Sequence, residues 1–164
     1  HVWWYIARSG GIVALILSAA SVLWGLLLSS RYLQGGPKPA GLLNLHKFLG
    51  ALTVVFSLVH VAGLYLDSFV EFGIAELLIP FRSGWKPVEV AWGVIAFWLL
   101  VAVQLSSMMM RRIPRRLWKW IHLASYVLLP LGIVHGITAG TDSGSTWYQL
   151  ISGGLIGLLA FLTA

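Results

Sequence analysis

The chain has 164 residues, of which 59% are hydrophobic and only 10% are charged, and it carries a formal net charge of +6. A mean hydropathy of +0.87 excludes a water-soluble domain and indicates an integral membrane protein. The absence of cysteine excludes disulfides, iron–sulfur clusters and thiolate ligands to a metal. A chain of this length is expected to form one domain, residues 1–164.

Five apolar segments follow one another along the chain, each close to the ~20 residues that a helix needs to cross a bilayer. None of them alternates polar and apolar residues, which argues against a strand barrel. The chain begins at His1 and ends inside an apolar run, so we expect both ends to be incomplete. The sequence therefore predicts an all-α bundle of about five transmembrane helices, at about residues 10–29, 41–66, 88–110, 118–139 and 147–164.

The first predicted helix carries small residues at steps of three or four, which place them on one face. Such a stripe is typical of close helix packing in membranes, here against neighbouring helices or a partner subunit. Its members are Gly11, Ala14, Ser18, Ser21 and Gly25.

The second predicted helix contains two histidines, His46 and His60, separated by 14 residues. This spacing corresponds to roughly 20 Å along a helix and to 3.9 turns, so both imidazoles point within roughly 40° of each other. Small and hydroxyl side chains lie between them on the same face, and Gly63 continues close to it. That face consists of His46, Gly50, Thr53, Ser57 and His60.

The fourth predicted helix contains His122 and His135, separated by 13 residues, which an ideal helix would direct roughly 140° apart. A distortion is therefore required. Pro130 lies between the two histidines and removes the hydrogen bond to the Tyr126 carbonyl, which gives a reason for a kink there. Gly132 and Gly136 would let a flat ligand approach the backbone closely.

The charges predict the orientation of the helices, because lysine and arginine are retained on the cytoplasmic side of short loops. One set of helix ends is purely basic, and the other holds all five acidic residues, so we expect the basic loop at residues 111–119 to be cytoplasmic in a multi-pass prokaryotic inner-membrane protein. These charges are explained by topology and lipid headgroups, and nucleic acid is not an expected partner. The basic ends carry Arg31, Lys38, Lys47, Arg111, Arg112, Arg115, Arg116 and Lys119, and the opposite ends carry Arg8, Arg82, Lys86, Asp67, Glu71, Glu76, Glu89 and Asp142.

With that orientation the two histidine-bearing helices run parallel, so His46 should face His122 near the cytoplasm and His60 should face His135 near the outer leaflet. Two imidazoles on opposite sides of a porphyrin saturate its iron, which favours electron transfer. The pattern predicts two stacked haems. The alternative is that the histidines are polar members of a helix interface.

Other site chemistries fit the sequence less well. Zinc needs three or four converging ligands, whereas each depth offers two histidines and no carboxylate. A proton or ion transporter would carry acidic residues within its helices, and here all five lie in predicted loops or at helix ends.

The histidine motifs are NLHKFLG, SLVHVAG, KWIHLASY and GIVHGIT, and over residues 10–142 the chain resembles the ferric reductase-like transmembrane domain. That superfamily includes NADPH oxidases, ferric reductases and the haem-binding membrane subunit of the periplasmic methionine sulfoxide reductase system. The resemblance implies two low-spin haem b groups with bis-histidine ligation. It also implies that electrons move from a cytoplasmic donor to an extracytoplasmic acceptor protein or metal chelate.

No flavin- or nicotinamide-binding domain follows the last predicted helix, so we expect an electron-transfer subunit of an oxidoreductase. Its donor would be a flavoprotein, a ferredoxin-like protein, quinone or a missing C-terminal domain. Two alternatives remain. One is a quinone-linked b-type cytochrome in a respiratory or photosynthetic complex, and the other is a helical subunit without redox turnover.

Cations near the predicted haems are candidates to pair their propionates. On the inner side these are Lys47, Arg116 and Lys119, which the topology explains equally well. On the outer side, residues 74–81 are apolar enough to lie on the membrane surface as a lid, and Arg82 and Lys86 follow them. Arg82 and Lys86 would meet propionates or an anionic acceptor, or lie in a solvated loop.

Overall fold

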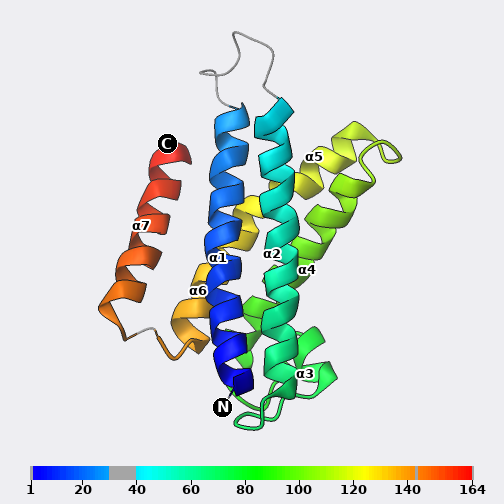
Figure 1. Cartoon of the computed structure of the whole chain (residues 1–164). Coiled ribbons are helices and arrows are strands. Elements are labelled where there is room, and N and C mark those ends of the chain that lie inside the picture. The colour runs from blue at the N-terminus through cyan, green and yellow to red at the C-terminus, as the bar shows by residue number, and fades with distance from the viewer. Residues whose placement is uncertain (1, 30–39, 143, 164) are drawn as a thin grey trace.

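The computed structural model describes residues 2–29, 40–142 and 144–163, and within them every regular element is helical (Figure 1). The predicted loop that carries Arg31 and Lys38 lies outside the described residues, as does His1. The helices are α1 (Val2–Ser29), α2 (Ala40–Leu66), α3 (Ile74–Leu78), α4 (Pro87–Met108), α5 (Arg115–Leu123), α6 (Ser125–Ala139) and α7 (Thr146–Thr163).

Four candidate spans are long and apolar enough to cross a membrane: α1, α2, α4 and the joined segment Arg115–Ala139, which contains α5 and α6. The chain is therefore a multi-pass membrane protein. The fifth predicted segment does form a helix, α7, but α7 is not among the four candidates found in the described residues. A helix of this length rises roughly 27 Å, which is slightly less than the ~30 Å hydrocarbon core. A fifth span stays a prediction.

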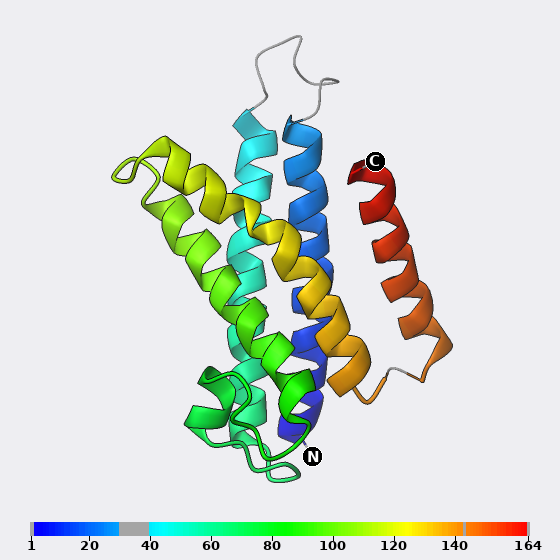
Figure 2. The same ribbon diagram turned by 180° about the vertical axis from the view of Figure 1, so that it is seen from behind.

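Two pairs of helices build the bundle (Figures 1 and 2). α1 lies antiparallel along α2, and α4 lies along α6 behind them, while α7 stands at the outside next to α1 and α6. α2 and the α5–α6 segment run in the same direction, as Figure 1 shows. The space between the two pairs is therefore bordered by α1, α2, α4 and α6.

Close packing between α1 and α2 depends on small residues. A Cβ placed on Gly63 would lie only 2.8 Å from the backbone nitrogen of Ala7, so the two backbones touch here. Ala14 and Ser18 of the predicted small-residue stripe are buried, and the indole nitrogen of Trp24 donates to the Leu42 carbonyl at 3.1 Å near the other end. Small side chains thus set the distance between the two helices.

The break in the fourth predicted span lies at Ala124 and not at Pro130. The Ala124 N–H bonds to the Ile121 carbonyl at 3.0 Å, three residues back, where α5 ends and α6 begins. Pro130 lies inside α6. A turn closed over three residues rotates the chain by about 120° per residue instead of about 100°, which changes the relative direction of the residues before and after it.

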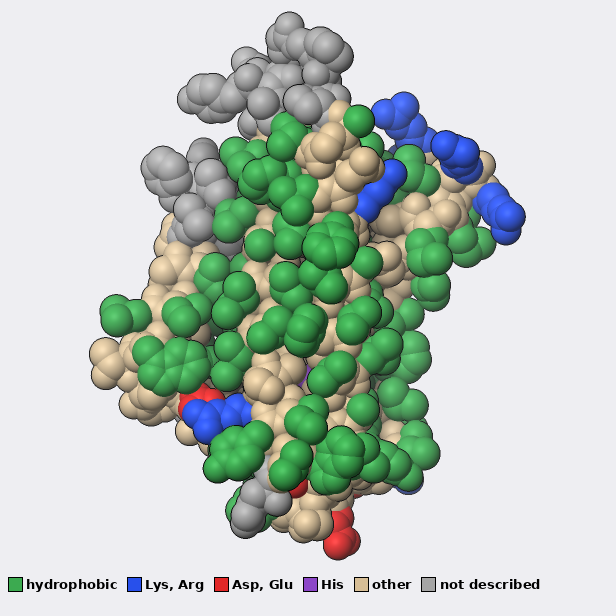
Figure 3. All heavy atoms as spheres, viewed as in Figure 1, with side chains coloured by type: hydrophobic (Ala, Val, Ile, Leu, Met, Phe, Trp, Pro, Cys, Tyr) green, Lys and Arg blue, Asp and Glu red, His purple; other side chains and the backbone are tan. Residues whose placement is uncertain are grey.

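The segment between α2 and α4 folds over one end of the bundle and contains α3. Phe72 and Leu77 are buried there against Val90 and Val94 of α4. The Trp98 indole nitrogen donates to the Leu78 carbonyl at 2.8 Å and fastens α3 to α4. This segment covers the end of the bundle opposite the α4–α5 connection. Figure 3 shows Lys and Arg side chains clustered at the α4–α5 connection, above a largely apolar surface.

Candidate metal centre

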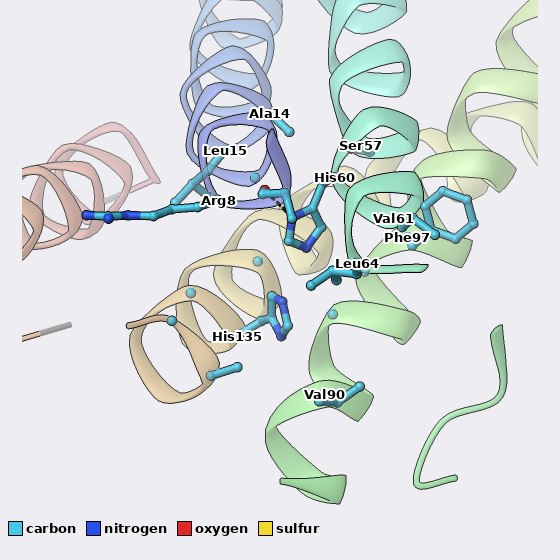
Figure 4. A pocket seen from close by; sticks show the side chains of 18 of the residues that line it. Arg8, Ala14, Leu15, Ser57, His60, Val61, Leu64, Val90, Phe97 and His135 are labelled. Atoms are coloured by element: carbon cyan, nitrogen blue, oxygen red, sulfur yellow. Dashed lines mark hydrogen bonds between the residues drawn. The ribbon is translucent and has the colours of Figure 1, made fainter. Parts of the chain in front are cut away.

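The four histidines lie in two facing pairs at two levels of the bundle. His46 of α2 and His122 of α5 have ring centroids 6.0 Å apart, and their ring planes meet at 68°. His60 of α2 and His135 of α6 have centroids 6.2 Å apart and an angle of 78°. Figure 4 shows the His60 and His135 rings directed toward one another from opposite sides of a cavity. We call these the inner pair and the outer pair.

Three of the imidazoles bond through Nδ1 to a backbone carbonyl of a neighbouring helix. His60 meets the Ala7 carbonyl at 2.7 Å, His135 meets the Glu89 carbonyl at 2.8 Å, and His46 meets the Ser21 carbonyl at 3.0 Å. A carbonyl only accepts, so Nδ1 must carry the proton and donate in each case. The neutral ring then has its lone pair on Nε2, which is the arrangement of a histidine that binds a metal through Nε2.

His122 is held differently. Its Nδ1 lies 3.3 Å from the hydroxyl oxygen of Ser107 on α4. The ring also stacks on Trp118 one turn earlier in α5, with centroids 5.0 Å apart and planes 27° apart. The Trp118 indole nitrogen is buried and has no hydrogen-bond partner within the described chain. A buried donor without a partner next to a candidate ligand leaves room for an acceptor that the polypeptide does not supply.

A cavity of about 290 Å³ surrounds the outer pair, between α1, α2, α4 and α6 (Figure 4). Its walls are mostly apolar, with hydroxyl groups from Thr53 and Ser57 of the predicted α2 face. Arg8 and Asp142 line it too, and the Arg8 guanidinium donates two hydrogen bonds to the Asp142 carboxylate. Each pair offers only two protein ligands, and no cluster of three or more His, Asp or Glu side chains occurs in the described residues.

Comparison with protein families gives a match to the ferric reductase-like transmembrane component over residues 10–133, which is more than half of the chain. The chain belongs to this family. The resemblance predicted from the histidine motifs is confirmed, and membership indicates a role in membrane electron transfer. Comparison with curated proteins and with solved structures gives no match.

The matched segment of this ferric reductase-like component contains His46, His60 and His122, and His135 lies two residues beyond its end. The structure places His135 opposite His60 all the same.

The predicted glycines divide between two roles. Gly132 and Gly136 line the outer cavity, where Gly136 also meets the Tyr148 hydroxyl. Gly63 lies at the α1–α2 backbone contact, and a Cβ on Gly50 would lie 3.4 Å from the side-chain oxygen of Gln104 on α4. Gly50 and Gly63 are therefore placed at helix contacts.

The predicted cations have exposed side chains. The side chains of Lys47, Arg116, Lys119 and Arg82 make no hydrogen bond or ion pair with another described residue. Lys86 donates to the Thr138 carbonyl at 2.9 Å and lies over the Trp85 ring.

Sequence reasoning did not identify the groups that hold the imidazoles. Three of them are backbone carbonyls, and the sequence signal that could have found them is the glycine four residues after each one, Gly11, Gly25 and Gly93. Ser107, Trp118 and Arg8 were also not predicted as site residues, although the i to i+4 spacing of Trp118 and His122 offered a signal for that stack.

Proposed function

We propose that the chain is a two-haem b-type cytochrome that moves electrons across the membrane from a cytoplasmic donor to an extracytoplasmic acceptor, as the membrane subunit of an oxidoreductase. The observation that supports this most strongly is the pair of facing imidazoles at each of two levels, with Nδ1 occupied and Nε2 left for a metal.

The separation of the rings fits one metal ion between each pair. A metal–imidazole nitrogen bond is about 2.0 Å long, and ring bonds of about 1.35 Å place each nitrogen about 1.15 Å from its ring centre. Rings bound on opposite sides of one ion therefore have centroids about 6.3 Å apart. The measured separations of 6.0 and 6.2 Å agree with this value.

Two protein ligands per level favour a cofactor that brings its own equatorial donors. A bare zinc ion needs three or four ligands from the chain, and each level has two. A haem would bring its own ring nitrogens, so that two histidines of the chain would suffice to hold it. The apolar cavity around His60 and His135, which Gly132 and Gly136 line, suits a flat apolar macrocycle.

Haem would supply reversible one-electron chemistry. His46 and His122 would hold the inner group, and His60 and His135 the outer group. The separation of His46 and His60 along α2, 14 residues or roughly 21 Å, would place one redox centre toward each leaflet.

Charge supports the proposed direction. Arg111, Arg112 and Arg116 are exposed at or beside the α4–α5 connection, which lies at the end of the bundle that holds the inner pair. The positive-inside rule would place that end in the cytoplasm. Lys47, Arg116 and Lys119 would there meet propionates or an acidic surface on the donor. At the other end, the Arg8–Asp142 pair lies at the cavity of the outer histidines.

The test is the haem content of the purified protein, measured with reduced-minus-oxidised spectra on the parent chain, His60→Ala and His122→Ala. We expect two low-spin b haems per parent chain and one in each variant. A parent chain without haem would overturn the proposal. Reduction of the parent by a quinol, and not by a soluble flavoprotein or ferredoxin, would replace the cytoplasmic donor with a membrane one.

A further inference from the structure

The three imidazoles that donate to backbone carbonyls share one local arrangement. In each case the residue four positions after the carbonyl is glycine, as the pairs Ala7/Gly11, Ser21/Gly25 and Glu89/Gly93 show. Each glycine touches the same imidazole. A Cβ on Gly11 would lie 2.9 Å from His60 Nδ1, a Cβ on Gly93 2.7 Å from His135 Nδ1, and a Cβ on Gly25 3.3 Å from His46 Cε1.

Helix geometry explains why glycine occurs at this position. The carbonyl of residue i points along the helix toward the N–H of residue i+4, and it keeps a second lone pair. A side chain at i+4 covers this lone pair, whereas glycine leaves it open to a group from another helix. We refer to such a carbonyl with its glycine as a seat.

The seats repeat with the spacing of the histidines. Gly11 and Gly25 of α1 are 14 residues apart, as are His46 and His60 of α2. Because α1 and α2 are antiparallel, Gly25 meets His46 and Gly11 meets His60. At each of the two levels, α1 therefore presents one seat and α2 presents one histidine.

The same interval of 14 residues on α4 separates the third seat, Glu89/Gly93, from the residue that contacts His122. Fourteen residues after Glu89 and Gly93 come Val103 and Ser107. The Val103 carbonyl accepts the Ser106 hydroxyl at 3.0 Å, and Ser107 stands where the other seats have glycine. Its hydroxyl, 3.3 Å from His122 Nδ1, takes the place of the carbonyl.

We propose that Gly11, Gly25, Gly93 and Ser107 are positioning residues that fix the tautomer and direction of the four imidazoles, and that Ser107 makes the inner metal site electronically different from the outer one. This inference rests on the proposed haem function. A carbonyl that accepts from Nδ1–H makes the imidazole a stronger donor to a metal. The outer pair has two such carbonyls, at 2.7 and 2.8 Å, and the inner pair has one, at 3.0 Å, with a more distant hydroxyl opposite.

The first experiment compares Gly93→Ala with Gly153→Ala, since a Cβ on Gly153 of α7 meets no atom within 4 Å. The measurement is haem per chain in the purified protein, with the spectrum of each haem. We expect Gly93→Ala to weaken retention of one haem by about 10–100-fold while Gly153→Ala keeps both. Full retention of both haems in Gly93→Ala would overturn the glycine part of the inference.

The second experiment adds no atoms, so it does not depend on whether a packed glycine can be replaced. Ser107→Ala removes the hydroxyl beside His122, and the adjacent Ser106→Ala removes a hydroxyl that bonds only within α4. In a redox titration we expect Ser107→Ala to raise one of the two midpoint potentials and leave the other unchanged. Ser107→Thr should keep the parent value, because it retains the hydroxyl.

Equal potentials in Ser107→Ala and the parent, or an equal shift in Ser106→Ala, would overturn the special role of Ser107. These outcomes are distinguishable from failure of the proposed function. A parent chain that binds no haem would overturn both the proposed function and the role of Ser107. Two bound haems whose potentials do not change in Ser107→Ala would overturn only the role of Ser107.

Discussion

The outer and inner histidine pairs reach nearly the same ring separation by different means. At the outer level both imidazoles bond to backbone carbonyls, four helices border a cavity, and the segment that contains α3 covers the end. At the inner level one ring bonds to a carbonyl, the other lies near a serine hydroxyl and stacks on Trp118, and exposed cations surround the helix ends. Helix packing thus shapes the outer site, whereas side chains and charge have more influence on the inner one.

The difference between the two ends should extend to the compartments that they face. The chain has no cysteine, so a single one can be introduced at either end. With a membrane-impermeant maleimide we expect Glu71→Cys to be labelled in intact cells and Arg112→Cys only after permeabilisation. Both residues are exposed. The reverse pattern would invert the proposed direction of electron transfer.

Glycine-to-alanine substitution should affect stability differently in the two halves of α2. A Cβ on Gly63 would lie 2.8 Å from backbone of α1, whereas on Gly50 it would meet the end of the Gln104 side chain at 3.4 Å. We expect Gly63→Ala to lower the free energy of unfolding by about 1–3 kcal/mol, because backbone cannot move aside easily. Gly50→Ala should be neutral within about 1 kcal/mol. Thermal unfolding in detergent measures both, and equal losses would contradict the difference.

The Arg8–Asp142 pair should stabilise the outer end. Asp142 has a side chain only 11% exposed, so removal of Arg8 leaves a partly buried carboxylate without its cation. We expect Arg8→Gln to cost about 1–2 kcal/mol of stability, which is more than an exposed pair contributes. A double-mutant cycle with Asp142→Asn should give a coupling free energy of the same sign, and no coupling would show that the pair is incidental.

Acidic pH should slightly destabilise the segment that contains α3 and covers the outer end of the bundle. The backbone N–H groups of Gly73 and Gly84 donate to the Glu76 carboxylate at 2.8 and 3.0 Å, and they hold its pKa below its usual value of 4.5. A lowered pKa in the folded state means that the contribution is present above pH 4.5 and is lost as the pH falls below it.

Hydrogen exchange of the Gly73 and Gly84 amides should therefore rise on acidification, after correction for the intrinsic rate. In Glu76→Gln, which cannot titrate at this position, the corrected exchange should not change over the same pH range. A pH response that persists in this variant would assign the effect to another group.

The sequence predicted most of the fold because apolar segments and histidine spacing are local properties. The boundaries of α2 follow directly from the apolar run at residues 41–66, whereas α1 begins at Val2, eight residues before the predicted start at residue 10. The break at Ala124 was not predicted, because Ala124 has no local effect that a sequence displays, in contrast to Pro130.

The candidate site was predictable only in part, for a similar reason. The four histidines are recognisable because ionisable residues within membrane helices are unusual. Their partners are backbone carbonyls and glycines on α1 and α4, which become meaningful only when the helices are placed side by side. Gly63 shows that a small residue near the histidine face also has a packing role, because it lies at the α1–α2 backbone contact.

The proposed function requires the two histidine pairs to form one electron path across the membrane. The most direct test is to reconstitute the protein in sealed vesicles that contain ascorbate, with ferricyanide outside, and to follow ferricyanide reduction. We expect reduction by vesicles with the parent chain and a fall to the rate of protein-free vesicles for both His60→Ala and His122→Ala. Reduction at the parent rate in either variant would contradict a path that needs both pairs.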